Sequence, residues 1–191
     1  MLNLVLFGKP GSGKGTQANF LKDRYSLVHI STGDVFRKNI KNQTKLGLKA
    51  EAYTQNGELV PDDVTVLMLE NEIKQNLPCK GFIFDGFPRT LYQADEMNKI
   101  LFKYKMKLSA IVALDVDDDL LTDRLLKRGL ISGRSDDQSR EKILTRLNEY
   151  RNKTEPLIEY YSKINRFHSV SGVGEIHEIS LRLLDLVESV K

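Results

Sequence analysis

The 191-residue sequence has a single cysteine, Cys79, which excludes both an internal disulfide and a zinc site built from clustered cysteines. No apolar stretch approaches the roughly 18 residues that a membrane-spanning helix needs. The first residues also lack the basic segment and long apolar segment of a secretory signal, because the apolar run at residues 2–7 is too short. We therefore expect a cytoplasmic protein that does not bind a membrane.

The chain also lacks a strong excess of charge of either sign. It has 29 lysines and arginines against 26 aspartates and glutamates, and the net charge of +3 is too small to indicate a nucleic-acid partner. Hydrophobic residues make up 40% of the sequence and charged residues 29%, as in an ordinary globular protein. Because this length suits one domain and no internal repeat is present, we expect a single domain over residues 1–191.

Short apolar runs alternate with helical patterns along the chain. The runs lie at residues 2–7, 27–30, 81–84, 110–114 and 167–170. They are continuous, which is typical of parallel strands buried on both faces. The helical patterns lie near residues 14–24, 62–75, 90–105, 117–128, 138–164 and 175–190. This order predicts an α/β fold, a doubly wound parallel sheet of about five strands flanked by helices, with ligands beyond the carboxyl ends of the strands.

The stretch GKPGSGKGT, residues 8–16, follows the first predicted strand and opens the first predicted helix. Its glycines allow backbone N–H groups to point at an anion, and the helix amino terminus adds the positive end of its dipole. Lys14 supplies a point charge that can reach terminal phosphates. The stretch matches GxxxxGK, with Gly15 in place of the usual serine or threonine and Thr16 one position later. A nucleoside triphosphate with magnesium is the expected ligand; the alternative is a glycine-rich turn without a ligand.

Two stretches depart from the alternation of strands and helices. Residues 31–60 contain polar, helix-like segments, and residues 129–137, GLISGRSDD, are predicted to form a loop between two helices. Insertions at the ligand-binding end of a rigid sheet are candidates for moving covers. Ordinary surface loops are the alternative.

Six arginines occur at predicted loops and helix ends: Arg37, Arg89, Arg124, Arg128, Arg134 and Arg146. The planar guanidinium matches phosphate oxygens, and phosphoryl transfer is catalysed mainly by positioning and charge stabilisation. Together with the phosphate loop, the arginines predict two phosphorylated ligands that meet end to end. Asp85 ends an apolar strand and is a candidate to hold magnesium, with a helix cap as the alternative. The three histidines form no pattern, and we expect structural or surface roles for them.

Several motifs, taken in order, resemble those of the adenylate kinases, which are nucleoside monophosphate kinases. The phosphate loop has the family's form, including Gly15. The segments STGDVFR (31–37), GELVPD (57–62) and DGFPRTLYQAD (85–95) resemble the family's monophosphate-binding segments. The segments DRLLKR (123–128), SGRSDD (132–137) and RLNEYRNKTEPLIEYY (146–161) resemble its lid region and the helix that follows. The resemblance extends along nearly the whole chain.

The resemblance implies the reversible reaction ATP + AMP ⇌ 2 ADP, which serves adenine nucleotide homeostasis and purine nucleotide salvage. It places the ATP phosphates on Gly11, Ser12, Gly13, Lys14, Gly15 and Thr16, with Arg128 and Gly174 beside the adenine. It places AMP on Thr32, Arg37, Glu58, Leu59, Val60, Gly86, Phe87, Pro88, Arg89 and Gln93. The residues implied in catalysis are Lys14, Arg89 and Asp85, together with Arg124, Arg134 and Arg146, which bridge the phosphates.

The resemblance also makes residues 31–60 a small helical AMP-binding insert and residues 129–137 a short lid. Only a few residues separate Arg128 from Arg134 and no cysteine pair is present, so we expect the short-lid form without zinc. Magnesium is expected to arrive with ATP and to be bridged to Asp85 through water, with no direct protein ligand. The phosphate of AMP has a second pKa of about 6, so it is largely ionised near neutrality and needs no general base.

A kinase for UMP and CMP is the nearest alternative, because it shares the fold and the DGFPR motif. Similar proteins that prefer pyrimidines carry a different small residue in place of Thr32 and asparagine near Gln93, whereas the amide edge of Gln93 suits adenine. A nucleotide-binding protein without turnover and a hydrolysing motor or GTPase are more distant alternatives. The complete set of Lys14, Asp85 and arginines favours an enzyme. We expect a monomer that binds ATP, AMP and ADP.

Overall fold

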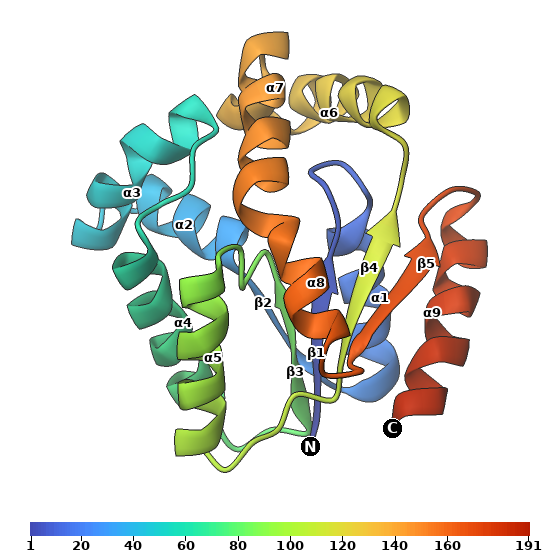
Figure 1. Ribbon diagram of the computed structural model, residues 1–191. Helices are drawn as coiled ribbons and strands as arrows, with labels where there is room; N and C mark the ends of the chain where they lie inside the picture. The colour runs from blue at the N-terminus through green and yellow to red at the C-terminus, as the bar shows by residue number, and fades with distance from the viewer.

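The computed structural model describes residues 1–191 and contains a single five-stranded sheet in which every neighbouring pair of strands is parallel. The strands are β1 (Leu2–Phe7), β2 (Val28–Ser31), β3 (Gly81–Asp85), β4 (Ala110–Asp115) and β5 (Phe167–Ser171). Their order in the sheet is β2-β3-β1-β4-β5, and their carboxyl ends point toward the top of Figure 1. The predicted doubly wound parallel sheet is confirmed.

Helices cover both faces of the sheet and rise beyond its carboxyl edge (Figure 1). They are α1 (Lys14–Tyr25), α2 (Thr32–Lys41), α3 (Lys45–Asn56), α4 (Asp62–Asn76), α5 (Leu91–Lys103), α6 (Asp118–Ser132), α7 (Arg140–Glu149), α8 (Pro156–Ser162) and α9 (Ile176–Val190). A 3-10 turn, η1 (Ser135–Asp137), precedes α7, and a π-helical turn, η2 (Tyr150–Thr154), joins α7 to α8.

The core consists of two apolar layers, one on each face of the sheet. Alternate residues of β1 enter opposite layers: Val5 and Phe7 pack with α4, α5 and α8, whereas Leu4 and Leu6 pack with α1 and α9. A strand that is buried on both faces must be apolar at every position, because successive side chains point to opposite sides. The continuous apolar runs of the sequence therefore have a direct structural cause.

Two differences from the predicted elements lie near the carboxyl edge of the sheet. The helix predicted over 117–128 continues to Ser132 as α6, so the first four residues of the predicted loop 129–137 are helical. This helix ends where Gly133 adopts a left-handed conformation with φ 63° and donates its N–H to the carbonyl of Gly129. The single helix predicted over 138–164 is interrupted by the π-helical turn η2.

The two segments above the sheet have small apolar clusters of their own. In the 31–60 segment, helices α2 and α3 pack around Phe36 and Ala50, together with Val60 and Met68. Helices α6 and α7, which flank the 129–137 segment, pack around a second cluster that includes Leu125 and Ile143. Both clusters are separate from the two layers on the sheet.

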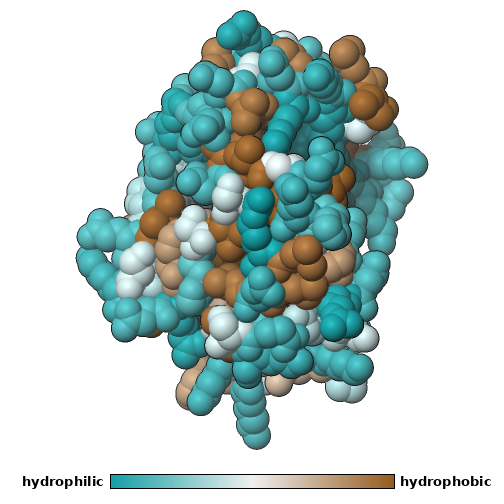
Figure 2. Space-filling view, turned by 90° about the vertical axis from the view of Figure 1, so that its right-hand side faces the viewer, coloured by the Kyte–Doolittle hydropathy of each residue, from teal (hydrophilic) through white to brown (hydrophobic).

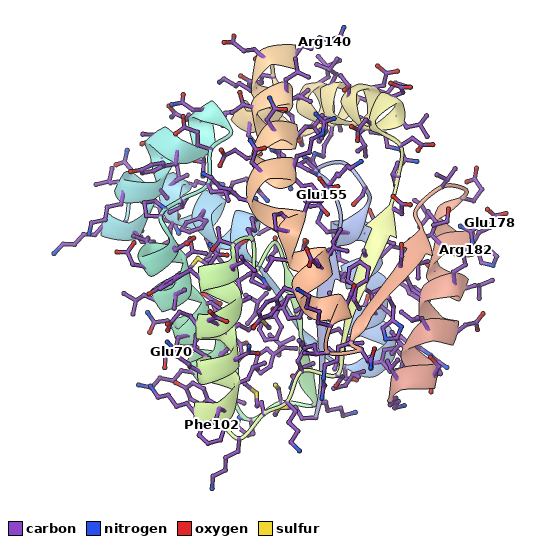
Figure 3. All side chains as sticks on the ribbon, viewed as in Figure 1. Glu70, Phe102, Arg140, Glu155, Glu178 and Arg182 are labelled. Carbon is purple, nitrogen blue, oxygen red and sulfur yellow. The ribbon has the colours of Figure 1, made fainter.

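The surface is mostly hydrophilic. On the face that Figure 2 shows, hydrophobic residues gather mainly in the middle of the view and at its upper right edge, among hydrophilic ones. Glu178 and Arg182 project outward from α9, while Phe102, which is 85% exposed, projects from the end of α5 (Figure 3). None of the helices combines the length and the apolar character that crossing a bilayer requires.

The contact between β1 and β3 depends on a position without a side chain. Gly81 lies opposite Leu2, and a Cβ at Gly81 would be 1.8 Å from the Leu2 carbonyl oxygen. We expect Gly81→Ala to lower the free energy of unfolding by at least about 3 kcal/mol, because the two strands would have to separate. In the control Gly133→Ala nothing lies within 4 Å of the new Cβ, so only the left-handed backbone is strained, at about 1 kcal/mol. Equal losses in denaturant unfolding would contradict this explanation.

Candidate active site

The phosphate loop connects β1 to α1 in a conformation that only glycine tolerates at two positions. Gly13 precedes α1 with φ 95°, and nothing lies within 4 Å of where its Cβ would be. A Cβ at Gly8 would be 2.6 Å from Ser12 Oγ and 2.7 Å from the Leu114 carbonyl. The loop therefore presents bare backbone and an open helix amino terminus, which is the arrangement that binds phosphate.

Lys14 is the first residue of α1, and its ammonium group lies inside the curve of the loop. Its Nζ donates to the carbonyl oxygens of Gly8 at 2.6 Å and Lys9 at 3.0 Å. Burial lowers the pKa of Lys14 to about 8, because the raising effect of Asp85 is smaller than the combined effect of desolvation and nearby arginines. Lys14 is therefore a cation whose charge is easily lost.

One cavity of about 400 Å³ lies above the phosphate loop and extends to the 31–60 segment. It contains most of the residues expected at the two nucleotide sites. These are Gly11, Gly13, Lys14, Gly15, Thr16, Thr32, Arg37, Glu58, Leu59, Val60, Asp85, Gly86, Pro88, Arg89, Gln93, Arg134 and Arg146. Five expected residues do not line it: Ser12, Phe87, Arg124, Arg128 and Gly174.

Ser12 and Phe87 lie beneath the cavity wall. Each is only 1% exposed, and Phe87 belongs to the apolar layer formed with α4, α5 and α8. Phe87 therefore supports the DGFPR segment through packing, and its aromatic ring is not available to a ligand in this arrangement. This differs from the expected contact with AMP.

Three arginines of the cavity are held close together although their charges repel. Burial, together with the charges of neighbouring arginines, lowers the pKa of Arg89, Arg134 and Arg146 below the ordinary value for arginine. Arg146 is compensated by Asp136 at 2.8 Å and by a closer contact with Asp137. The sequence motif SGRSDD contains both aspartates, but nothing in the motif indicated that they hold an arginine.

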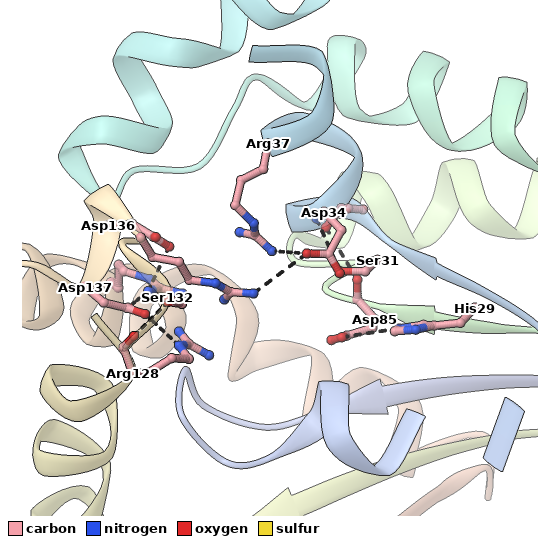
Figure 4. Close-up of polar contacts among 12 residues, drawn as sticks. His29, Ser31, Asp34, Arg37, Asp85, Arg128, Ser132, Asp136 and Asp137 are labelled. Atoms are coloured by element: carbon pink, nitrogen blue, oxygen red, sulfur yellow. Dashed lines mark hydrogen bonds and ion pairs between the residues drawn. The ribbon is translucent and has the colours of Figure 1, made fainter. Parts of the chain in front are cut away.

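Arg128, and not Arg124, belongs to this arginine cluster. Arg128 Nε donates to Asp137 at 2.6 Å, as Figure 4 shows, and Asp137 is completely buried. The charge of Arg128 is among the causes that lower the pKa values of Lys14 and Arg146. The sequence prediction placed Arg124 at the phosphates and Arg128 beside adenine; neither side chain lines the cavity, and both roles stay predictions.

Asp34 joins the two segments above the sheet. Its carboxylate accepts from Arg37 on the same helix and lies 3.7 Å from Arg134 on the opposite side of the cavity (Figure 4). Burial alone would raise the pKa of Asp34, but the contacts with Arg37, Ser31 and Arg134 outweigh it and leave that pKa low. Asp34 is therefore an anion that both segments share, and no role had been predicted for it.

Asp85 lies at the carboxyl end of β3 and lines the cavity beside the phosphate loop. Its Oδ2 is 3.5 Å from Nε2 of His29 on β2, a pairing that Figure 4 shows and that the sequence did not indicate. Burial would raise the pKa of Asp85, but His29 and the positive charges of Lys14 and Arg89 lower it overall. An ionised carboxylate at this place suits magnesium, which keeps several waters and needs few protein ligands. No group of three or more histidine, cysteine, aspartate or glutamate side chains is arranged to hold a metal ion.

The far end of the cavity is organised around the amide of Gln93. Its Oε1 accepts from the backbone N–H of Arg89 at 2.7 Å, and its Nε2 donates to Asp62 at 2.7 Å. Asp62 also accepts from the hydroxyl of Thr90 at 2.8 Å. Because a carboxylate can only accept, Asp62 fixes which end of the Gln93 amide faces it. Gln93 is 2% exposed and still lines the cavity, so its remaining N–H and oxygen lone pair have a fixed orientation.

The phosphate loop thus lines one side of a cavity whose remaining wall includes several arginines, backbone and Gln93. This arrangement defines a P-loop phosphotransferase that receives two phosphorylated ligands. The chain matches the family model of adenylate kinase over residues 6–166. The adenylate kinases of Flavobacterium psychrophilum and Flavobacterium johnsoniae are 53% and 52% identical to it over 190 residues, with 100% of both chains covered.

The adenylate kinase of Porphyromonas gingivalis is 46% identical over 191 residues, covering 100% of this chain and 98% of the relative. The chain therefore belongs to the adenylate kinase family, whose enzymes convert ATP and AMP into two molecules of ADP. Its fold and its cavity agree with this membership.

Asp62→Asn tests whether Asp62 fixes the Gln93 amide. Asparagine can donate as well as accept, so the amide could turn, and we expect kcat/KM for AMP to fall about tenfold, as for one lost buried hydrogen bond. The preference for AMP over CMP should fall with it, while KM for ATP stays near its original value. Asp63→Asn is the matched control, because Asp63 is exposed in the same first turn of α4. Unchanged base preference in Asp62→Asn would contradict this role.

The lowered pKa of Lys14 predicts a pH dependence of ATP binding. Below pH 8 the free protein carries a charged Lys14, and above it the amine is increasingly neutral, so ATP binding then requires uptake of a proton. We expect Kd for ATP to rise about tenfold between pH 7 and 9, one factor of ten for each pH unit above the pKa. Calorimetric titration over this range measures it. In Lys14→Met the rise should vanish, and an equal rise in that variant would assign it to another group.

Proposed function

We propose that ATP and AMP bind at opposite ends of the single cavity, with ATP on the phosphate loop and AMP between the 31–60 segment and residues 85–93. The supporting observation is that the phosphate loop and Gln93 line the same cavity of about 400 Å³. The ATP phosphates contact Gly11, Gly13, Lys14, Gly15 and Thr16. AMP contacts Thr32, Arg37, Glu58, Leu59, Val60, Gly86, Pro88, Arg89 and Gln93.

The reaction needs alignment and charge stabilisation more than proton transfer. The attacking oxygen belongs to the AMP phosphate, which is largely ionised near neutrality because its second pKa is about 6. No general base is therefore assigned. Lys14, Arg89, Arg134 and Arg146 surround the path of the phosphoryl group and offset the charge that spreads over its oxygens.

Asp85 would hold, through water, the magnesium that accompanies ATP, and the ion would neutralise charge on the ATP phosphates. The chain's own contribution is to keep Asp85 ionised through its pairing with His29 and the positive charge of Lys14. We propose that the enzyme carries no zinc, in agreement with the lack of a cysteine cluster in the sequence.

The 31–60 segment acts as an AMP-binding cover and the 129–137 segment as a short lid. Water is the competing acceptor of the phosphoryl group, so a cavity that closes only over both nucleotides suppresses hydrolysis. The contact between Asp34 and Arg134 supports this role, because it connects one cover to the other across the cavity. The cover and the lid can move separately because each packs on its own apolar cluster.

We assign Arg128 to the phosphates and Arg124 to the adenine of ATP. Arg124 lies one helical turn before Arg128, outside the arginine cluster. The loop that contains Gly174 lies beside the phosphate loop and beside Val116, which precedes α6. A Cβ at Gly172 would be 2.6 Å from Val116 and 3.4 Å from the Ser12 carbonyl oxygen. The adenine of ATP then lies between this loop and α6.

AMP is preferred over pyrimidine monophosphates because Gln93 presents a fixed hydrogen-bonding edge to the cavity. The enzyme serves adenine nucleotide homeostasis and purine salvage as a cytoplasmic monomer. A coupled assay of ADP formation with ATP against AMP, CMP, UMP and GMP tests the substrate. AMP should give a kcat/KM at least about tenfold above the others. Equal use of CMP or UMP would favour the pyrimidine alternative.

The two arginines of α6 have distinguishable kinetic effects. We expect Arg128→Ala to lower kcat by about 100-fold, as for loss of one donor to the transition state, with a smaller change in KM. Arg124→Ala should mainly raise KM for ATP, because adenine contacts are the same in the ground and transition states. Steady-state kinetics with ATP varied at saturating AMP measures both. A lowered kcat in Arg124→Ala with mainly a raised KM for ATP in Arg128→Ala would instead place Arg124 at the phosphates and Arg128 beside the adenine.

A further inference from the structure

A cluster of three charged side chains lies next to the phosphate loop but outside the cavity. Lys9 Nζ is 2.6 Å from Oδ1 of Asp118, and Arg151 contacts the other oxygen, Oδ2, of the same carboxylate. None of the three lines the nucleotide cavity. The two cations hold the pKa of Asp118 below its usual range, so the carboxylate is ionised near neutral pH. None of these three side chains has a role in the binding or transfer steps proposed above.

The cluster connects three elements that must be aligned for phosphoryl transfer. Lys9 belongs to the phosphate loop, and Asp118 is the first residue of α6, which carries Arg124 and Arg128. Arg151 belongs to the π-helical turn η2, whose first and last residues, Tyr150 and Thr154, line the cavity. Asp118 therefore joins the phosphate loop both to α6 and to η2.

The backbone of Lys9 carries the effect to the ammonium group of Lys14. The carbonyl of Lys9 accepts from Lys14 Nζ at 3.0 Å and from the N–H of Ser12 at 3.1 Å. The loop also rests directly on α6, because a Cβ at Gly11 would be 3.1 Å from Leu125 Cγ. A shift of Lys9 along α6 therefore moves an acceptor that holds Lys14.

We propose that Lys9 is a positioning residue for phosphoryl transfer: its side chain, held by Asp118, fixes the phosphate loop against α6 so that Lys14 and the arginines of the lid meet the same phosphoryl group. The ion pair is partly exposed, at 25% and 34% for the two side chains, so it contributes little to overall stability. A misplacement of about 1 Å can nevertheless cost about 100-fold in rate. The expected signature is a loss of kcat with little loss of stability.

The test compares Lys9→Met, Asp118→Asn and the double variant with the unmodified enzyme. We expect each single variant to lower kcat about tenfold, with KM for ATP changed less than about threefold. The double variant should lose no more than either single variant, because both remove the same contact. Lys9→Arg should recover most of kcat, since arginine can also reach the carboxylate. Asp119→Asn is the matched control, because Asp119 is exposed in the same first turn of α6.

The role of Lys9 rests on the role proposed for Lys14, and Lys14→Met separates the two. If Lys14→Met loses turnover while Lys9→Met stays within about twofold of the unmodified enzyme, the positioning role of Lys9 is wrong and the proposed function stands. If Lys14→Met itself keeps turnover, the proposed function fails. Losses that multiply in the double variant, or an equal loss in Asp119→Asn, would also overturn the proposal. The melting temperature, measured for every variant, should stay within a few degrees.

Discussion

Mutual repulsion among buried cations is the constraint around which the site is built. Arg89 and Arg146 both lower the pKa of Lys14, Arg89 also lowers the pKa of Arg146, and Arg128 lowers the pKa of both Lys14 and Arg146. The fold holds them together with carboxylates: Asp85 beside the phosphate loop, and Asp136 and Asp137 beside Arg146. A site with this much positive charge suits a triphosphate and a monophosphate better than any neutral ligand.

The remaining architecture follows from placing these charges on separately packed elements. The sheet, buried on both faces, fixes the phosphate loop and Asp85 at its carboxyl edge. Arg134 and Arg146 come from the part of the chain above the sheet, where α6 and α7 rest on an apolar cluster of their own. We propose that one part of the chain aligns one nucleotide rigidly and another part covers the second nucleotide.

Sequence patterns predicted the features that depend on local chemistry. Continuous apolar runs predicted the five strands, because a strand buried on both faces is apolar at every position. The glycines and lysine of GKPGSGKGT predicted the phosphate loop, because the loop needs bare backbone and one cation. Features that depend on tertiary pairing were missed. Arg124 and Arg128 lie four apart on one helix, so only the place of Asp137 distinguishes them. The pairing of His29 with Asp85 joins two neighbouring strands that are far apart in the sequence. The helix α6 continues past Gly129 and ends at Gly133, which adopts the left-handed conformation.

The central claim is that one cavity aligns two nucleotides and keeps water from the phosphoryl group. The most direct measurement is a single-turnover experiment with ATP labelled in the γ-phosphate, performed with and without AMP. With AMP, the label should appear in ADP and almost none in inorganic phosphate. Without AMP, release of inorganic phosphate should be slower than transfer by about 1,000-fold or more. Phosphate release at a rate that does not depend on AMP would contradict the account, because it would show that the cavity admits water as readily as the second nucleotide.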